Sequence, residues 1–244
     1  FFGLSEVHWT KDGAASLSAR QRNGHVVDCI RRAGWEVLQA QATSPADKAA
    51  GVLFAYDPRK VAIVGEPRVA KRAVGRILAM RIRLLGDRLH TELEVVLVYA
   101  PQQSHADKGL TKIFYDEVEE MCSLARDMLL LLGDLNARLR PWSEALSLRE
   151  SGEARLAGLA HRLHLERLGP ANDFTYQQWH TAPGGLPRLV TRQIDHVLAG
   201  RAAREYVHVK RTQEPLARRQ PPRPALPPPP GPPLPHRRRG VLCG

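Results

Sequence analysis

The sequence predicts a layered α/β (α+β) sandwich, in which strands packed face to face are covered on the outside by helices. About nine apolar segments have the length of strands, and two longer segments carry apolar residues at helical spacing. The composition is typical of one globular domain, because 43% of the 244 residues are hydrophobic and 25% are charged. With many strands and few helices, we expect the strands to form a mixed sheet.

The strand-length segments are short, rich in branched and aromatic residues, and separated by turn residues. We expect strands at Phe2–Val7, Trp35–Gln39, Gly51–Tyr56, Ile77–Leu84, Glu94–Tyr99, Met128–Leu132, Phe174–Gln178, Gln193–Leu198 and Tyr206–Lys210. Two helices are expected, from about Asp107 to Ala125 and from about Gly152 to Leu165, because apolar residues recur there every three or four positions. Each apolar stripe should pack on a sheet.

Composition excludes several classes of protein. No uninterrupted apolar run reaches the roughly 18–20 residues that cross a bilayer, and the run Met128–Leu132, for example, is closed by Gly133 and Asp134. Cys29, Cys122 and Cys243 have neither the even count of a disulfide scaffold nor the paired spacing of a zinc site. We therefore expect an intracellular protein, nuclear or cytoplasmic, that is monomeric and has no membrane role. The chain begins at Phe1 without the zones of a signal peptide, which suggests a fragment.

The net charge of +11 is concentrated near the C-terminus. Residues 201–244 carry ten Lys or Arg against two acids, which leaves only +3 for residues 1–200. Most of the prolines lie in the same segment, which therefore cannot form a core and is expected to be polyproline-like or disordered. Its basic and Pro-rich character suits an SH3-type or acidic partner or a nucleic-acid arm. The alternative, which the composition favours, is a solvated tail or an out-of-register translation.

Gly133-Asp134-Leu135-Asn136 follows an apolar run that reads as a fully buried strand. Residues two apart in an extended segment point the same way, so Asp134 and Asn136 could converge on one ligand while Leu135 anchors behind them. The alternative is a turn that ends the strand by bonding its own backbone.

Glu6 places a carboxylate within a short apolar strand. It needs an ion or an arginine if it is buried, and water suffices if the strand lies at an edge. Tyr99 ends another buried strand, where its hydroxyl could reach a phosphate or remain in the core. Asp195 and His196 are adjacent on a predicted strand, so their side chains diverge and cannot form one dyad.

Four motifs occur in a set order along the chain: Ser5-Glu6-Val7, Val98-Tyr99-Ala100-Pro101, Gly133-Asp134-Leu135-Asn136 and Gln193-Ile194-Asp195-His196. Over about residues 1–212, this combination resembles the endonuclease/exonuclease/phosphatase superfamily. Leu4–Trp9, Tyr99–Gln102, Ile113–Glu117 and Arg192–Leu198 are most similar to the branch of craniofacial development protein 2 and the LINE-type retrotransposon endonucleases.

The resemblance implies a four-layer αββα sandwich of two mixed sheets and a metal-dependent phosphodiesterase. Glu6 would bind Mg²⁺, with Mn²⁺ as the alternative ion, and Asp134 would orient or deprotonate the attacking water. Asn136 and Tyr99 would donate to the phosphate oxygens, and Asp195 would orient a histidine. The substrate would be nucleic acid, DNA before RNA, although the shared motifs do not separate these from small phosphate esters.

Both ends depart from the family pattern. Family members begin with a strand that carries an asparagine near the metal, and they finish with a Ser-Asp-His motif, whereas this chain enters Glu214-Pro215 and the Pro/Arg run. We therefore expect a domain at residues 1–212 without its first and last core strands, followed by a disordered tail at residues 213–244. The chain would be an endonuclease impaired by this loss, or alternatively an inactive degenerate fragment whose tail serves as an interaction segment.

Overall fold

The computed structural model describes residues 1–5, 26–41, 51–87, 91–102, 108–122, 127–148, 151–169, 176–180, 188–192 and 194–207. Their strands are β1 (Phe2–Ser5), β2 (Glu36–Ala40), β3 (Val52–Tyr56), β4 (Val61–Val69), β5 (Ile77–Leu84), β6 (Glu92–Tyr99), β7 (Leu129–Asp134), β8 (Glu166–Arg167), β9 (Tyr176–His180), β10 (Arg188–Arg192) and β11 (Asp195–Ala199). Their helices are α2 (Lys108–Cys122), α3 (Trp142–Ala145), α4 (Gly152–Arg162), the short 3-10 helices η2 (Leu146–Leu148) and η3 (Ala203–Glu205), and a segment at residues 26–32.

The described strands form three sheets, with the orders β1-β3-β2, β10-β9 and β4-β5-β6-β7-β11-β8. The six-stranded sheet is mixed, because β6 and β7 are parallel while the pairs on either side of them are antiparallel. A parallel pair requires a crossover connection, and α2 lies between β6 and β7 in the chain.

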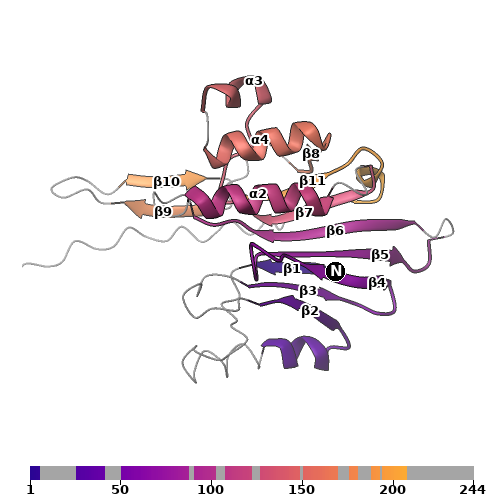
Figure 1. The fold of residues 1–244 in the computed structure, drawn as a ribbon. Helices are drawn as coiled ribbons and strands as arrows, with labels where there is room; N and C mark the ends of the chain where they lie inside the picture. The colour runs from indigo at the N-terminus through magenta and orange to yellow at the C-terminus, as the bar shows by residue number, and fades with distance from the viewer. Residues whose placement is uncertain are drawn as a thin grey trace, which may run out of the picture.

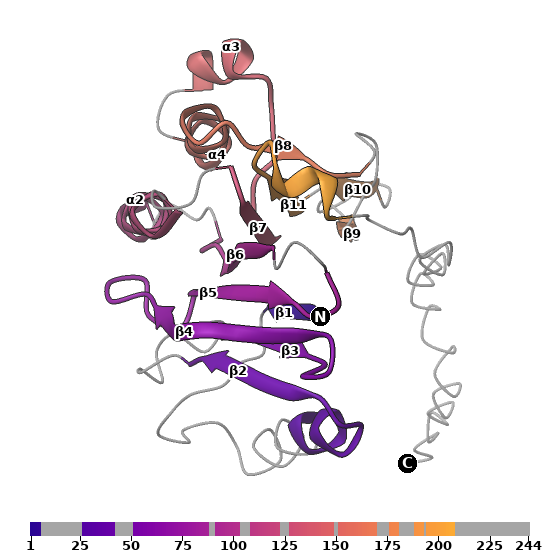
Figure 2. The same ribbon diagram turned by 90° about the vertical axis from the view of Figure 1, so that its right-hand side faces the viewer.

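Figures 1 and 2 show four layers: the helix at residues 26–32, the sheet β1-β3-β2, the six-stranded sheet, and helices α2 and α4. Each pair of neighbouring layers encloses a cluster of buried apolar side chains. Val27 packs with Leu53 and Ala55 in the first cluster. Phe54 and Leu97 belong to the inner core between the two sheets, and Phe114 belongs to the outer core under the helices. The predicted αββα sandwich is therefore confirmed, with one difference: the six-stranded sheet is mixed, whereas the described pairs of β1-β3-β2 are antiparallel.

Gly3 allows the two large sheets to approach closely. A Cβ atom at Gly3 would lie 2.5 Å from Leu97 Cδ1 and 3.2 Å from Leu132 Cδ1. Glycine is therefore the residue that fits where β1 lies across β6 and β7. The described part of β1 ends at Ser5, and Glu6 lies outside the described residues.

Several elements differ from the prediction. β4 was not expected, because a register shift between Val64 and Arg68 breaks its alternation and half of the strand is exposed. β8, β10 and the helix at residues 26–32 were not expected either. The strand expected at Tyr206–Lys210 is wrong for Tyr206 and Val207, which follow η3 and pack against the inner core without strand pairing.

Residues 208–244, which include the predicted tail at residues 213–244, lie outside the described residues. In the part of the chain that the structure describes, no helix has the length and apolar character needed to cross a membrane.

Candidate active site

Three of the predicted site residues lie in one row across three adjacent strands. Asp134 is the Cα partner of Tyr99 on the parallel strand β6 and of Asp195 on the antiparallel strand β11. Paired residues of neighbouring strands lie on the same face of a sheet, about 4.8 Å apart, so Tyr99 and Asp195 are separated by roughly 10 Å. Positions 99, 134 and 195 are thus brought together at one end of the sheet.

The alternation of the core shows which face of the sheet carries this row. Leu130 and Leu132 of β7 pack in the inner core, whereas Leu131 packs in the outer core under the helices. Asp134 continues the series of Leu130 and Leu132. The row therefore lies on the face that the six-stranded sheet turns toward β1.

Gly133 determines the backbone conformation immediately before Asp134. It adopts a φ of 137°, and a Cβ atom at this position would lie 2.0 Å from the carbonyl oxygen of Val98. Because no side chain fits in that space, glycine is required immediately before Asp134.

Asp134 and Asn136 form a tight turn where β7 ends. The backbone N–H of Asn136 donates to Asp134 Oδ1 at 2.7 Å, and the Asn136 side-chain Nδ2 donates to the Ala100 carbonyl at 2.7 Å. Asn136 has a φ of 46°, in the left-handed region that asparagine tolerates better than most residues. Asp134 therefore does bond its own backbone, as the turn interpretation predicts, and it also lies in the row with Tyr99 and Asp195.

Tyr99 lies deeper than its neighbours in the row. It is 1% exposed and belongs to the inner core. The guanidinium of Arg76 lies 5.3 Å from the centre of its ring, and Arg76 Nη1 donates to the Tyr99 carbonyl at 3.4 Å. Arg76 is itself buried, which gives this end of the sheet a fixed positive charge. Arg76 was not among the predicted site residues, although an arginine directly before the apolar residues Ile77–Met80 was a usable signal.

Asp195 and His196 point to opposite faces of β11, as the alternation predicts. Asp195 is exposed, whereas His196 is 3% exposed and its Nε2 lies 2.7 Å from the Ala137 carbonyl. A carbonyl only accepts, so Nε2 carries the proton. Burial lowers the pKa of His196, while the Ala137 hydrogen bond acts in the opposite direction. His196 is therefore a neutral donor and not the partner of Asp195.

The side chains around the row offer oxygen ligands. The row and its turn carry two carboxylates, one amide and one phenol, a set that suits Mg²⁺, which keeps several waters and needs only one or two carboxylates. It does not suit zinc, which prefers nitrogen and sulfur. Among the described residues, no group of three or more His, Cys, Asp or Glu is placed to share an ion. Glu6, the predicted metal ligand, is outside these residues.

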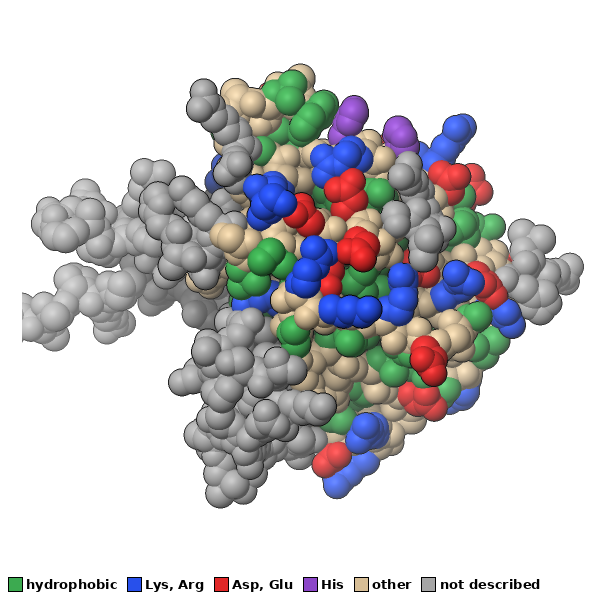
Figure 3. Space-filling view, viewed as in Figure 1, with side chains coloured by type: hydrophobic (Ala, Val, Ile, Leu, Met, Phe, Trp, Pro, Cys, Tyr) green, Lys and Arg blue, Asp and Glu red, His purple; other side chains and the backbone are tan. Residues whose placement is uncertain are grey.

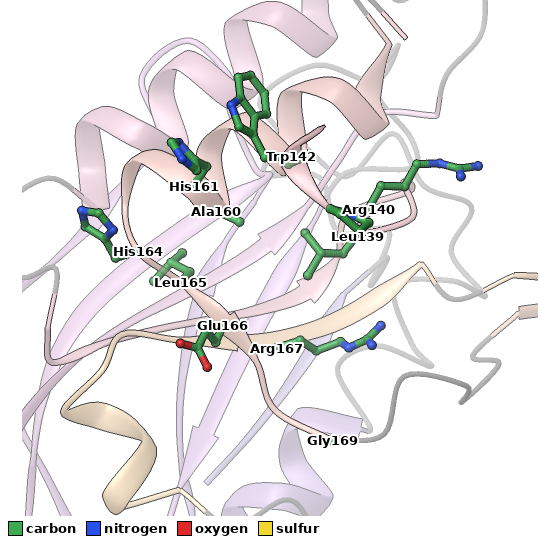
Figure 4. A pocket seen from close by; sticks show the side chains of 12 residues that line it. Leu139, Arg140, Trp142, Ala160, His161, His164, Leu165, Glu166, Arg167 and Gly169 are labelled. Carbon is green, nitrogen blue, oxygen red and sulfur yellow. The ribbon is translucent and has the colours of Figure 1, made fainter. Parts of the chain in front are cut away.

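A separate open cavity of about 680 Å³ lies between α3, α4 and β8. Figure 4 shows Trp142 and His161 on one side of it and Arg167 on the other. None of the row residues lines this cavity, so it is not the site that the sequence motifs define.

The surface over α2 is not a continuous basic patch. Figure 3 shows Lys and Arg interspersed with Asp and Glu on this face. The described ion pairs Arg72–Glu120, Lys112–Asp116 and Arg162–Glu119 account for part of this mixture. A polyanion would gain little net attraction here.

The chain matches no protein-family model and no curated protein. Among solved structures, it is similar to the AP endonuclease LMAP from Leishmania major, with 17% identity, a TM-score of 0.52, and coverage of 83% of this chain and 70% of that chain. It is also similar to the endonuclease domain of TRAS1, a telomere-specific non-LTR retrotransposon, with 17% identity, a TM-score of 0.46, and coverage of 68% and 67%. A third similar structure is D. rerio TDP2 complexed with a single-strand DNA product, with 10% identity, a TM-score of 0.45, and coverage of 80% of this chain and 68% of that chain.

At these identities the likeness concerns the fold. The chain shares its fold with the AP endonuclease LMAP. The resemblance expected from the four sequence motifs is therefore confirmed for the fold.

Proposed function

We propose that the chain is a divalent-metal-dependent phosphodiester hydrolase that cleaves nucleic acid as an endonuclease. The observation that carries the proposal is the row of Tyr99, Asp134 and Asp195 across three adjacent strands, with Asn136 in the turn that follows. The similarity in fold to an AP endonuclease supports DNA as the substrate.

Glu6 is the proposed metal ligand. It directly follows β1, and Gly3 of β1 packs on Leu97 and Leu132, two residues before Tyr99 and Asp134 on their strands. A bound Mg²⁺ or Mn²⁺ would polarise the phosphate and neutralise its developing charge. The oxygen-rich row supports a hard cation of this kind.

Asp134 is the proposed base for the attacking water. One of its carboxylate oxygens closes the turn with the Asn136 N–H, which fixes the orientation of the carboxylate. A carboxylate held in this way can orient a water and accept its proton as the bond to phosphorus forms.

Asn136 and Tyr99 are the proposed donors to the phosphate. One N–H of the Asn136 amide bonds the Ala100 carbonyl, and the second is proposed to donate to a nonbridging oxygen as negative charge develops there. Tyr99 would donate from the floor of the site, where Arg76 adds a buried positive charge.

Asp195 is proposed to orient a histidine beside the phosphate, by fixing its tautomer and stabilising its protonated form. His196 does not supply that imidazole, because its ring lies on the opposite face of β11 and bonds Ala137.

The test is nicking of plasmid DNA that contains abasic sites, with Mg²⁺, with Mn²⁺ and with a chelator. We expect metal-stimulated nicking that chelation abolishes and that Asp134→Ala lowers by about 10²-fold or more. Asp116→Ala, which removes a carboxylate from the surface of α2, is the matched control and should cleave like the unsubstituted chain. Equal rates for Asp134→Ala and the unsubstituted chain would reject the proposal, and complete inactivity would favour the inactive-fragment alternative.

A further inference from the structure

The turn that carries Asp134 and Asn136 is held by two buried side chains that the proposed chemistry does not use. Tyr115 Oη donates to the Leu135 carbonyl at 3.1 Å. His196 Nε2 donates to the Ala137 carbonyl at 2.7 Å. The two acceptors belong to the residues immediately before and after Asn136, so the hydrogen bonds fix the backbone on both sides of the left-handed residue.

The two donors come from the two layers that enclose the outer core, the helices and the six-stranded sheet. Tyr115 lies on α2, and His196 lies on β11, the strand next to β7. They are 4% and 3% exposed, so water does not readily replace either donor. Leu135, 1% exposed, packs in the same core and holds the turn against the sheet.

Both donors keep their protons under ordinary conditions. Burial raises the pKa of Tyr115, and the nearby Asp134 carboxylate raises it further, so its hydroxyl stays protonated. Among the described residues, no group hydrogen-bonds His196 Nδ1, and burial lowers the pKa of the ring, so His196 stays neutral with its proton on Nε2. The Ala137 hydrogen bond commits this Nε2 proton to the turn.

We propose that Tyr115 and His196 are positioning residues that hold the turn at residues 134–137 so that Asp134 and Asn136 face one phosphate together. The catalytic consequence of this inference rests on the proposed function. The clamp, by which we mean the two hydrogen bonds from Tyr115 and His196 to the turn, is a property of the turn itself. Small misplacement of a reacting group is sufficient to slow an enzyme strongly. Loss of either hydrogen bond should therefore reduce turnover more than it reduces substrate binding.

Kinetics with conservative variants test the catalytic part. We expect Tyr115→Phe to lower kcat about tenfold with KM changed less than about twofold. Tyr56→Phe is the matched control, because the Tyr56 hydroxyl also donates a hydrogen bond, to the Glu36 carboxylate, on strands β2 and β3 away from the turn. His196→Leu should show a similar loss, and His196→Gln should restore most of the rate, since the glutamine Nε2 can donate from nearly the same place.

Hydrogen exchange tests the clamp without any activity. The Leu135 amide donates to the Ile194 carbonyl and the Asn136 amide donates to Asp134 Oδ1. Both amides should exchange about tenfold faster in Tyr115→Phe and His196→Leu than in Tyr56→Phe, under conditions in which all variants remain folded.

The two readouts separate the two proposals. Absence of hydrolysis in the unsubstituted chain would reject the proposed function, and exchange would still decide the clamp. Unchanged exchange in both variants would overturn the clamp. Faster exchange with a kcat equal to that of Tyr56→Phe would also overturn the positioning role. A His196→Gln variant no faster than His196→Leu would remove His196 from it.

Discussion

The carboxylates of Asp134 and Glu117 lie on opposite sides of the six-stranded sheet, and both accept hydrogen bonds from backbone N–H groups. They differ in how deeply they are buried. Glu117 of α2 is 5% exposed and accepts from three consecutive backbone N–H groups, those of Lys71, Arg72 and Ala73, at 2.6–3.1 Å. Asp134 is half-buried and accepts the backbone N–H of Asn136. A carboxylate enclosed by three donors is structural, whereas one that closes a single turn at a strand end remains suited to chemistry.

The largest expected effect is on the kcat of Asp134→Asn, and it distinguishes a catalytic carboxylate from a structural one. Asp134→Asn should lower kcat by about 10²–10⁴-fold, because the amide cannot accept a proton from water. Its stability should change little, since the asparagine Oδ1 can still accept the Asn136 N–H and close the turn. Nicking assays and urea unfolding of Asp134→Asn and the surface control Asp116→Asn check this. A large loss of stability together with activity would place Asp134 in the same class as Glu117.

A second test addresses the backbone that leads into the turn. Gly133→Ala should cost about 3 kcal/mol or more in the free energy of unfolding, because its Cβ would meet the Val98 carbonyl oxygen at 2.0 Å. Gly65→Ala is the matched control, since Gly65 also has a positive φ, of 74°, but no atom lies within 4 Å of the added Cβ. We expect about 1 kcal/mol there. Urea unfolding would contradict the prediction if both variants lost the same stability.

Glu117→Gln tests whether the role of Glu117 is structural. The glutamine amide nitrogen cannot accept, so at least one backbone N–H among residues 71–73 is left buried without its acceptor. The free energy of unfolding should fall by about 1–3 kcal/mol, with kcat unchanged while the variant remains folded. Glu120→Gln, at an exposed position on the same helix, should leave both quantities unchanged. A kcat effect as large as that of Asp134→Asn would contradict the division of roles.

The smallest expected effect is on the pH dependence of stability. Burial acts to raise the pKa of Glu117, but the hydrogen bonds from the backbone of Ala73, Arg72 and Lys71 prevail and lower it. Its contribution is therefore fully present above the ordinary glutamate pKa of about 4.3 and is lost as the pH falls below that value through the lowered pKa. Urea unfolding between pH 7 and pH 3 should show a shallower acid loss in Glu117→Gln. Parallel curves for the two proteins would show that Glu117 is not a source of the acid sensitivity.

Part of the site could be anticipated from local pattern. The apolar run before Gly133 indicated a buried strand at Met128–Leu132, which the structure extends to Asp134, and the alternation after Gln193 indicated that Asp195 and His196 diverge. Both features depend on residues that are neighbours in the chain, so they can be predicted from the local sequence pattern. The adjacency of Asp195 to Asp134 depends on strand order and could not be obtained from spacing.

Other features had no local signal of this kind. β4 was missed because its register shift and exposed residues hide the period of a strand. Tyr115 fits an amphipathic helix, and its position there says nothing of the Leu135 carbonyl that it contacts. Arg76 is buried beside Tyr99 only because β5 and β6 pair in a particular register.

The amino-acid sequence alone determined the buried strands β3, β5, β6 and β7 and the two amphipathic helices α2 and α4, because each is encoded by residues close together in the chain. Only the tertiary structure decided that positions 99, 134 and 195 form one row and that Tyr115 and His196 donate hydrogen bonds to the turn at residues 134–137. Strand order and register are set by the packing of the whole core, in which the contacts that matter join residues far apart in the sequence.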